Sequence, residues 1–282
     1  MVDYTDHKKL YLLCFTDDTE EDADLLFKNV FSKAKMVSKT DENGLPIAML
    51  FLMDAKIVTD GIPSDYYYLY AACTHPEYRG RGIMANLLEE AKEIAIKDNK
   101  SGIFLKPANP PLFKFYAKSN FLPYFNVCKI NTSSEDFIKQ YAPELFNAQT
   151  KSLEDWYYVR KDFLSAINSS YVDFSKEILT TAADGSTSLI ADDFGFVYEI
   201  RNSLLLVKEA LCKKGYIKEL FSAISYILKE TNCSSIEIRL PPLLIDQLTD
   251  FKDVLQPFSV MWFTPKANQP NKTNGHHGFA FD

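Results

Sequence analysis

The sequence has no apolar run as long as a membrane-spanning helix, which excludes an integral helical membrane protein. Glycine is scarce, at 10 of 282 residues, so two glycines close together stand out. Basic residues are in the minority, since 31 Lys and Arg face 38 Asp and Glu for a formal net charge of -7. Nucleic-acid binding relies on a basic surface. We therefore expect neither nucleic acid nor a membrane among the partners.

Cysteines are few, odd in number and without any pair at metal-ligand spacing: Cys14, Cys73, Cys128, Cys212 and Cys233. This pattern predicts free thiols, which are typical of a reducing compartment, rather than a disulfide framework. Residues 2–6 are polar and acidic, so no secretory signal peptide is expected. We predict a cytoplasmic protein without a metal. The neighbours His276 and His277 are too few ligands for a metal site and are expected in a loop.

The most informative stretch is residues 74–91, THPEYRGRGIMANLLEEA. A strand-like segment, residues 66–73, precedes it, and apolar residues with the spacing of one helical face follow from Ile83 to Ala95. Between them, Gly80 and Gly82 allow the backbone to approach a ligand without a Cβ in the way. The helix directs its free N–H groups and positive dipole end toward the same point. A strand, a glycine turn and a helix N-terminus together predict a phosphate site.

The other segments predict a mixed α+β fold around this loop. Helices are expected from Thr5 or Asp6 to about residue 15, over residues 20–33, and after Asn109-Pro110. Strands are expected at residues 35–39 and 45–53 around the turn Asn43-Gly44, and at 66–73, 101–106 and 122–130. This order places the phosphate loop in the middle of a mixed sheet.

The segment Glu77-Tyr-Arg-Gly-Arg-Gly-Ile83, placed after a strand, resembles the acyl-CoA loop of the GNAT N-acetyltransferases. That family writes the loop Arg/Gln-Xaa-Xaa-Gly-Xaa-Gly/Ala, and Arg79, Gly82 and Met84 occupy its places. Met84 departs from the family's small residue. The resemblance covers about the first half of the chain. It implies a mixed, mostly antiparallel sheet flanked by helices, the acyl-CoA N-acyltransferase fold, with acetyl-CoA as co-substrate.

The resemblance also implies roles for single residues. Tyr116 matches the family's Tyr-Xaa-Xaa-Xaa-Gly-Phe, with Asn120 in place of Gly, and its phenol would protonate the leaving thiolate. It could instead be one more core aromatic. Asn109 would reach the cofactor or simply cap a helix. The implied cofactor-binding residues are Ala72, Cys73, Thr74, Arg79, Gly80, Arg81, Gly82, Ile83, Met84, Ala85 and Asn109.

Two catalytic groups remain open at this level. Cys73 has no His partner at a fixed spacing, so we interpret it as a plain strand cysteine rather than a nucleophile. No general base lies in the motif. Asp60, Asp65, His75 and the terminal carboxylate of Asp282 could each serve.

The second half resembles a diverged internal repeat of the first at an offset of about 133 residues. This offset aligns Leu87 with Leu220 and Leu105 with Ile238. The copy lacks the loop, because residues 212–215 offer a single glycine. We therefore predict a catalytic GNAT domain at residues 1–150 and a degenerate GNAT-like domain, without a phosphate loop, at residues 151–282.

The predicted function is an N-acetyltransferase that moves an acetyl group from acetyl-CoA to an amine of a small molecule or peptide, by direct attack in a ternary complex. One alternative is a non-catalytic acyl-CoA-binding module that senses the cofactor. Another is an aminoacyl transferase of the tandem GNAT kind, which the acidic balance disfavours. The sequence specifies neither the acceptor nor the oligomeric state.

Overall fold

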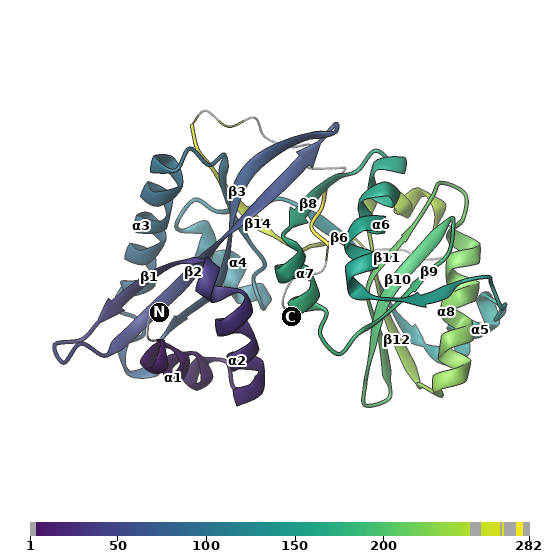
Figure 1. The fold of residues 1–282 in the computed structure, drawn as a ribbon, viewed down its shortest axis with the longest axis horizontal. Helices are drawn as coiled ribbons and strands as arrows, with labels where there is room; N and C mark the ends of the chain where they lie inside the picture. The colour runs from purple at the N-terminus through teal and green to yellow at the C-terminus, as the bar shows by residue number, and fades with distance from the viewer. Residues whose placement is uncertain (1–3, 249–254, 266, 268–274, 279–282) are drawn as a thin grey trace.

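The computed structural model describes residues 4–248, 255–265, 267 and 275–278. They form two sheets side by side, each flanked by helices, as Figure 1 shows. The mixed α+β architecture predicted from the sequence is confirmed.

The first sheet has eight strands among the described residues, in the order β15-β8-β2-β3-β4-β14-β5, with β1 paired to the first half of β2. The β3–β4 and β8–β15 pairs are parallel and the other pairs are antiparallel. The predicted hairpin at Asn43-Gly44 is confirmed as the β1–β2 turn. The bounds are Lys35–Thr40 (β1), Pro46–Thr59 (β2), Ile62–Thr74 (β3), Gly102–Leu105 (β4), Leu122–Pro123 (β5), Ser170–Phe174 (β8), Val260–Phe263 (β14) and Gly275–His276 (β15).

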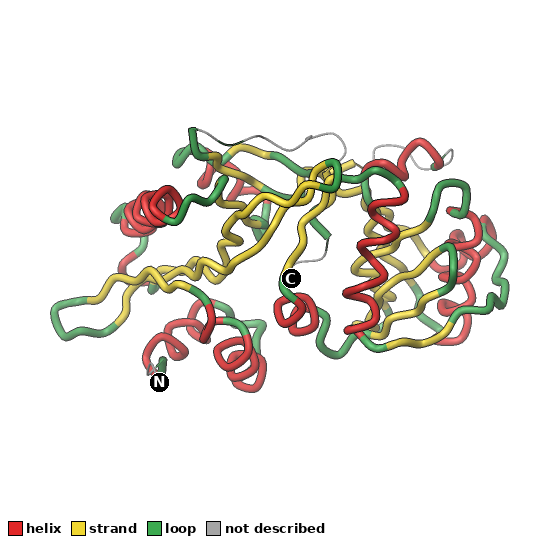
Figure 2. Tube along the Cα trace, turned by 45° about the horizontal axis from the view of Figure 1, so that its top comes forward, coloured by secondary structure: helices red, strands yellow, loops and turns green. Residues whose placement is uncertain are grey.

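Helices cover both faces of this sheet (Figure 2). On one face lie α1 (Thr5–Cys14) and α2 (Glu20–Asn29), which begins with the capping box expected at Thr19 and Asp22. On the other face lie α3 (Ile83–Lys97) and α4 (Pro110–Ala117). The spacing of Leu87, Leu88 and Ala91 explains how α3 packs, because all three are buried against the sheet.

The second sheet has seven strands among the described residues, in the order β13-β6-β12-β11-β10-β9-β7. Two helices, α5 (Ser134–Gln140) and α8 (Ile217–Thr231), cover its outer face, and α6 (Leu153–Ala166) with α7 (Lys176–Ala182) lies toward the first sheet. The bounds are Asn126–Ser133 (β6), Gln149–Lys151 (β7), Thr187–Ile190 (β9), Phe194–Arg201 (β10), Leu204–Cys212 (β11), Ser235–Leu240 (β12) and Leu255–Pro257 (β13).

One strand–helix–strand unit occurs in each half. β3–α3–β4 and β11–α8–β12 both place two parallel strands around a helix of 15 residues. Leu87 and Leu220, 133 positions apart, are both buried in these helices. Asn99 and Asn232 have the same separation, and both follow their helix in the left-handed conformation, with φ of 55° and 52°. The register of this unit is therefore kept in space as well as in sequence.

The boundary placed near residue 150 does not separate the strands of the two sheets. β6 was expected as a strand of the first domain, yet it pairs with β12 and β13 of the second sheet. β8, β14 and β15 come from the later half of the chain but belong to the first sheet. One apolar core even joins Phe51 and Met53 of β2 to Trp156 of α6 and Leu211 of β11. These pairings are non-local, so the hydrophobic period of each strand does not reveal them.

No helix in the described part of the chain is long and apolar enough to cross a membrane.

Candidate functional site

Strands β3 and β4 are paired over a short length only. Their ladder consists of Tyr67 with Ile103 and Tyr68 with Phe104, whereas β3 continues to Thr74. Beyond Tyr68, the edge of β3 that faces β4 has no ladder partner among the described strands. We call the region just beyond the Tyr68–Phe104 pair the fork. An unpaired strand edge offers backbone N–H and C=O groups to an extended ligand.

A β-bulge bends β3 just past the fork. On the β2 side, Met49 pairs with Cys73 and Phe51 with Tyr70, so Leu50 opposes both Ala71 and Ala72. Ala71 has a φ of 52°, a left-handed conformation that costs a residue with a Cβ roughly 1–2 kcal/mol. Such strained positions cluster at functional sites. The sequence carries no signal for this bulge.

The glycine loop, which contains Gly80 and Gly82, lies between the end of β3 and the start of α3. Gly80 and Gly82 have φ of 76° and 77°, and Gly82 is the N-cap of α3. A Cβ built on either glycine would meet no protein atom within 4 Å. Since the first helical hydrogen bond runs from the Asn86 N–H to the Gly82 carbonyl, the N–H groups of residues 83–85 have no helical acceptor. The loop thus combines open space at its two glycines with amide donors that no helical acceptor uses, as a phosphate site requires.

The two arginines of the loop are partly held by the backbone around it. Arg79 donates from Nε to the carbonyl of Thr74 over 3.1 Å. Arg81 donates from Nη2 to the carbonyl of Glu77 over 2.9 Å and stacks its guanidinium 4.9 Å above the Tyr78 ring. Met84 packs partly buried against the core between α3 and the sheet. Its long side chain therefore points away from the open side of the loop.

The structure also locates Tyr116 and Asn109. Tyr116 is buried on α4 against Phe115 and Phe121, and burial raises its pKa to about 12. Burial, then Tyr70 and then Tyr116 raise the pKa of Tyr68 above its usual range. The Tyr116 phenol therefore lies in the neighbourhood of Tyr68 and of the fork. Asn109 is the N-cap of α4, and its Oδ1 accepts from the Leu112 N–H over 3.3 Å. The capping interpretation therefore holds for its oxygen, and its amide N–H groups remain as donors.

Three of the base candidates lie within the described residues, two of them before the β3–β4 ladder and one in a helix cap. Asp60 is in the turn before β3, eight positions from Tyr68, which corresponds to roughly 26 Å along a strand. Asp65 is exposed on β3, before the β3–β4 ladder begins. His75 caps the 3-10 helix Pro76–Tyr78, since its Nδ1 accepts from the Glu77 N–H over 3.3 Å. Asp282 lies outside the described residues.

The expectation that His276 and His277 lie in a loop was wrong for His276, whereas His277 directly follows strand β15 without regular secondary structure. His276 belongs to β15, which pairs with β8, and both rings are fully buried. The His277 ring lies 5.8 Å from the Tyr68 ring and 5.3 Å from the Phe104 ring, between centroids, directly at the fork. Neither of its nitrogens has a hydrogen-bond partner among the residues that the structure describes. The sequence missed this residue because a two-residue strand between distant segments has no local pattern.

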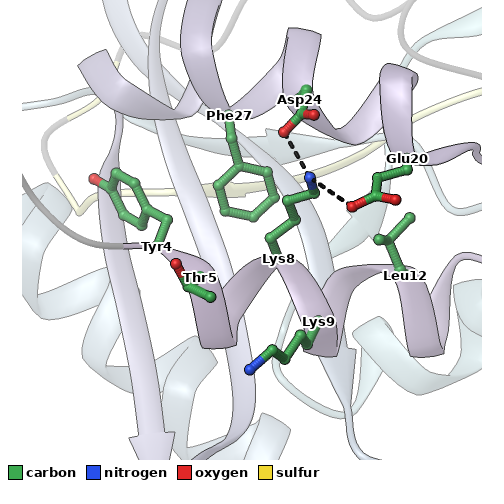
Figure 3. A pocket seen from close by; sticks show the side chains of 8 residues that line it. All are labelled: Tyr4, Thr5, Lys8, Lys9, Leu12, Glu20, Asp24 and Phe27. Carbon is green, nitrogen blue, oxygen red and sulfur yellow. Dashed lines mark hydrogen bonds and ion pairs between the residues drawn. The ribbon is translucent and has the colours of Figure 1, made fainter.

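A surface pocket of about 340 Å³ lies between α1 and α2 (Figure 3). Lys8 occupies it with ion pairs of 2.6 Å to Asp24 and 3.3 Å to Glu20. None of the predicted cofactor-binding residues lines it, so we assign no chemistry to it. Its lining is Tyr4, Thr5, Lys8, Lys9, Leu12, Glu20, Asp24 and Phe27.

Comparison with solved structures places most of the chain in one fold. A probable N-acyltransferase from Enterococcus faecalis V583 matches with a TM-score of 0.70 at 14% identity, over 92% of this chain and 70% of its own. A GCN5-related N-acetyltransferase from Kribbella flavida matches with 0.66 at 13%, over 92% and 68%. Eis1 from Mycobacterium abscessus matches with 0.66 at 11%, over 93% and 72%. At these identities the likeness shows the fold alone.

The sequence itself matches no curated protein. Residues 6–121, however, match the acetyltransferase (GNAT) family, and this range contains β3, the glycine loop, α3, β4 and α4. The part of this chain that carries the fork and the loop is therefore similar in sequence to the GNAT acetyltransferase family.

Proposed function

We propose that the protein is an N-acetyltransferase that transfers the acetyl group of acetyl-CoA to an amine of a small molecule or peptide, by direct attack in a ternary complex. The observation that supports this most is the fork with its glycine loop. An unpaired strand edge suits the extended pantetheine arm, and the open space before the α3 amides suits the pyrophosphate.

The chain's own residues supply the remaining chemistry. Backbone groups freed at the Ala71 bulge would polarise the thioester carbonyl. Tyr116 would give its proton to the leaving thiolate, because its phenol, whose pKa burial raises to about 12, carries its proton at neutral pH. Holding both reactants at the fork would convert a two-molecule reaction into an effectively intramolecular one.

The test is a titration of the full chain with acetyl-CoA by calorimetry, followed by an acceptor screen that monitors CoA release. We expect one binding site per chain, because the second lobe uses the Gly215 N–H for a 2.9 Å hydrogen bond to Gln247. We also expect acetyl transfer to at least one class among polyamines, aminoglycosides, amino acids and peptides. Binding without turnover on any acceptor would favour a sensing module instead.

Tyr116→Phe should lower kcat by roughly 10²- to 10⁴-fold, as expected for a lost proton donor. The affinity for acetyl-CoA should stay within about twofold, because the phenol is absent from the phosphate loop. Tyr198→Phe removes a half-buried phenol from the second lobe and is the matched control. Unchanged kcat over the whole pH profile would show that the phenol is only a core aromatic.

We further propose that His277 accepts the proton of the attacking amine, since its ring lies at the fork and its two nitrogens have no partner in the described part of the chain. Burial, before the smaller effects of nearby charges, holds the pKa of His277 well below its usual range, so the ring is neutral at pH 7. His277→Ala should lower kcat by roughly 10²-fold or more. Added imidazole should restore part of the rate, whereas His7→Ala should leave it unchanged. Failure of the rescue in a folded variant would give His277 a packing role only.

A further inference from the structure

Cys14 differs from the other four cysteines in its surroundings. Cys128 and Cys212 are buried in the core of the second sheet, and burial raises the pKa of each to about 12. Cys233 is buried in that core too. Cys14, the last residue of α1, is only half-buried. All five cysteines are free thiols.

Cys14 and Cys73 lie together under the loop. The Cys14 thiol donates to the Thr74 carbonyl over 3.6 Å, and this carbonyl also accepts from Nε of Arg79. Cys73 belongs to the core between α1 and the first sheet, Cys14 packs against the same core, and Thr74 directly follows Cys73 in β3. The folding of α1 onto the end of β3 thus brings two thiols and one guanidinium to one point.

This arrangement favours the thiolate of one cysteine over the other. The hydrogen bond from Cys73, opposed by burial and assisted by Arg79, lowers the pKa of Cys14 to about 7. The same hydrogen bond, with burial, raises the pKa of Cys73 well above its usual range. Because the thiolate is the nucleophile and Cys14 is the more exposed of the two, Cys14 is the thiol that reacts first.

We propose that Cys14 and Cys73 form an oxidisable dithiol, in which Cys14 reacts with a peroxide and Cys73 closes the disulfide. The proposal stands on the contact of the Cys14 thiol with the carbonyl of Thr74, the residue next to Cys73, on the apolar core that both cysteines contact, and on the half-exposure of Cys14.

The oxidation balances with hydrogen peroxide as the oxidant. The Cys14 thiolate attacks one peroxide oxygen, the O–O bond breaks, and a sulfenic acid forms, while the leaving hydroxide takes up the proton that Cys14 had released and becomes the first water. Cys14 then carries no negative charge, so it no longer raises the pKa of the Cys73 thiol. Cys73 gives up its proton and attacks the sulfenic sulfur, the S–O bond breaks, and a second water forms. The two thiols lose two electrons and two protons in total.

Closing the disulfide should affect the loop, and this consequence rests on the proposed function. Thr74 is the residue between Cys73 and the loop, and its carbonyl anchors Arg79. A bond between the sulfurs replaces the Cys14 hydrogen bond to that carbonyl and draws the end of β3 toward α1. We expect oxidation to raise the acetyl-CoA Kd at least about tenfold, within the usual range of coupling between two sites.

The site is tested on the reduced full chain, treated with hydrogen peroxide, alkylated under denaturing conditions, digested and examined by mass spectrometry. We expect a peptide that links Cys14 to Cys73, with Cys128, Cys212 and Cys233 alkylated. Cys14→Ser should abolish the link, and Cys128→Ser should leave it unchanged. Cys73→Ser should stop at a sulfenic acid on Cys14 that dimedone traps. Absence of the linked peptide from the wild type would overturn the proposal.

The coupling is tested by calorimetry with acetyl-CoA before oxidation, after oxidation and after reduction by dithiothreitol. Affinity should fall on oxidation and return on reduction. Equal affinity in the linked and reduced forms would refute the coupling. If the reduced protein does not bind acetyl-CoA, the proposed function fails while the peptide map still decides the dithiol.

Discussion

Gly82→Val is expected to abolish acetyl-CoA binding while the protein stays folded. Gly82 has a φ of 77°, which a β-branched residue rarely adopts. A Cβ at this position would meet no protein atom within 4 Å, so nothing in the fold opposes the side chain itself. Gly82 is the N-cap of α3, so we expect the valine to crowd the phosphate that the α3 amide groups would bind. The free energy of unfolding should therefore fall by only roughly 1–2 kcal/mol, the cost of a left-handed valine, whereas the phosphate should no longer fit in the loop.

A matched control exists in the second lobe. Gly215 follows Gly82 by 133 positions, also precedes a helix, and has a φ of 96° with open space around its Cβ position. Gly215→Val therefore carries a similar backbone strain without touching the loop. Calorimetry should find no measurable acetyl-CoA binding in the first variant and near-normal binding in the second. Near-normal affinity in folded Gly82→Val would remove the basis of the proposed function.

The sequence predicted the local parts of the site well, because each depends on neighbours along the chain. The pair Gly80 and Gly82 marks a turn that needs two left-handed residues, and the structure has both. The spacing of apolar residues predicted α3, and Thr19 with Asp22 predicted the start of α2. Such signals depend on backbone angles and on one helical face, which a few adjacent residues determine.

The parts that the sequence did not predict arise where distant segments meet. His277 reaches the fork because β15 pairs with β8, across about a hundred residues of chain. Cys14 reaches Cys73 because α1 packs on the end of β3. No glycine or proline in the sequence indicates the bulge at Ala71. Each of these depends on tertiary packing, which a single sequence reveals only through regular periods.

A buried charge cluster at the join between the sheets gives the largest expected effect on stability. The Glu209 carboxylate of β11 accepts four hydrogen bonds: from Trp156 Nε1 at 3.0 Å, from Arg160 Nε at 3.0 Å and Nη2 at 2.8 Å, and from His276 Nε2 at 2.9 Å. All four side chains are fully buried. His276 belongs to β15 of the first sheet, so Glu209 connects the two sheets.

Glu209→Gln should lower the free energy of unfolding by about 3–5 kcal/mol, because it leaves the Arg160 guanidinium buried without its counter-charge. The N–H groups of the Gln amide would also face the N–H groups of Trp156, Arg160 and His276, which now donate to the carboxylate. Glu154→Gln is the matched control, since it breaks an exposed pair with Lys176 and should cost no more than about 1 kcal/mol. Denaturant unfolding measures both variants, and a loss below 1 kcal/mol in Glu209→Gln would contradict the prediction.

The difference in the free energy of unfolding between the wild type and Glu209→Gln should depend on pH, which provides a second check. Burial alone would raise the pKa of Glu209, but the charge of Arg160 and the hydrogen bonds hold it well below its usual range. A carboxylate whose pKa is lowered by folding stabilises the protein above its unfolded pKa, about 4.3, and loses this contribution as the pH falls toward the folded value. The wild type and Glu209→Gln should therefore differ fully at pH 7 and converge below about pH 4.3. A gap that stays constant down to pH 3 would mean that packing, rather than the charge of Glu209, accounts for the loss.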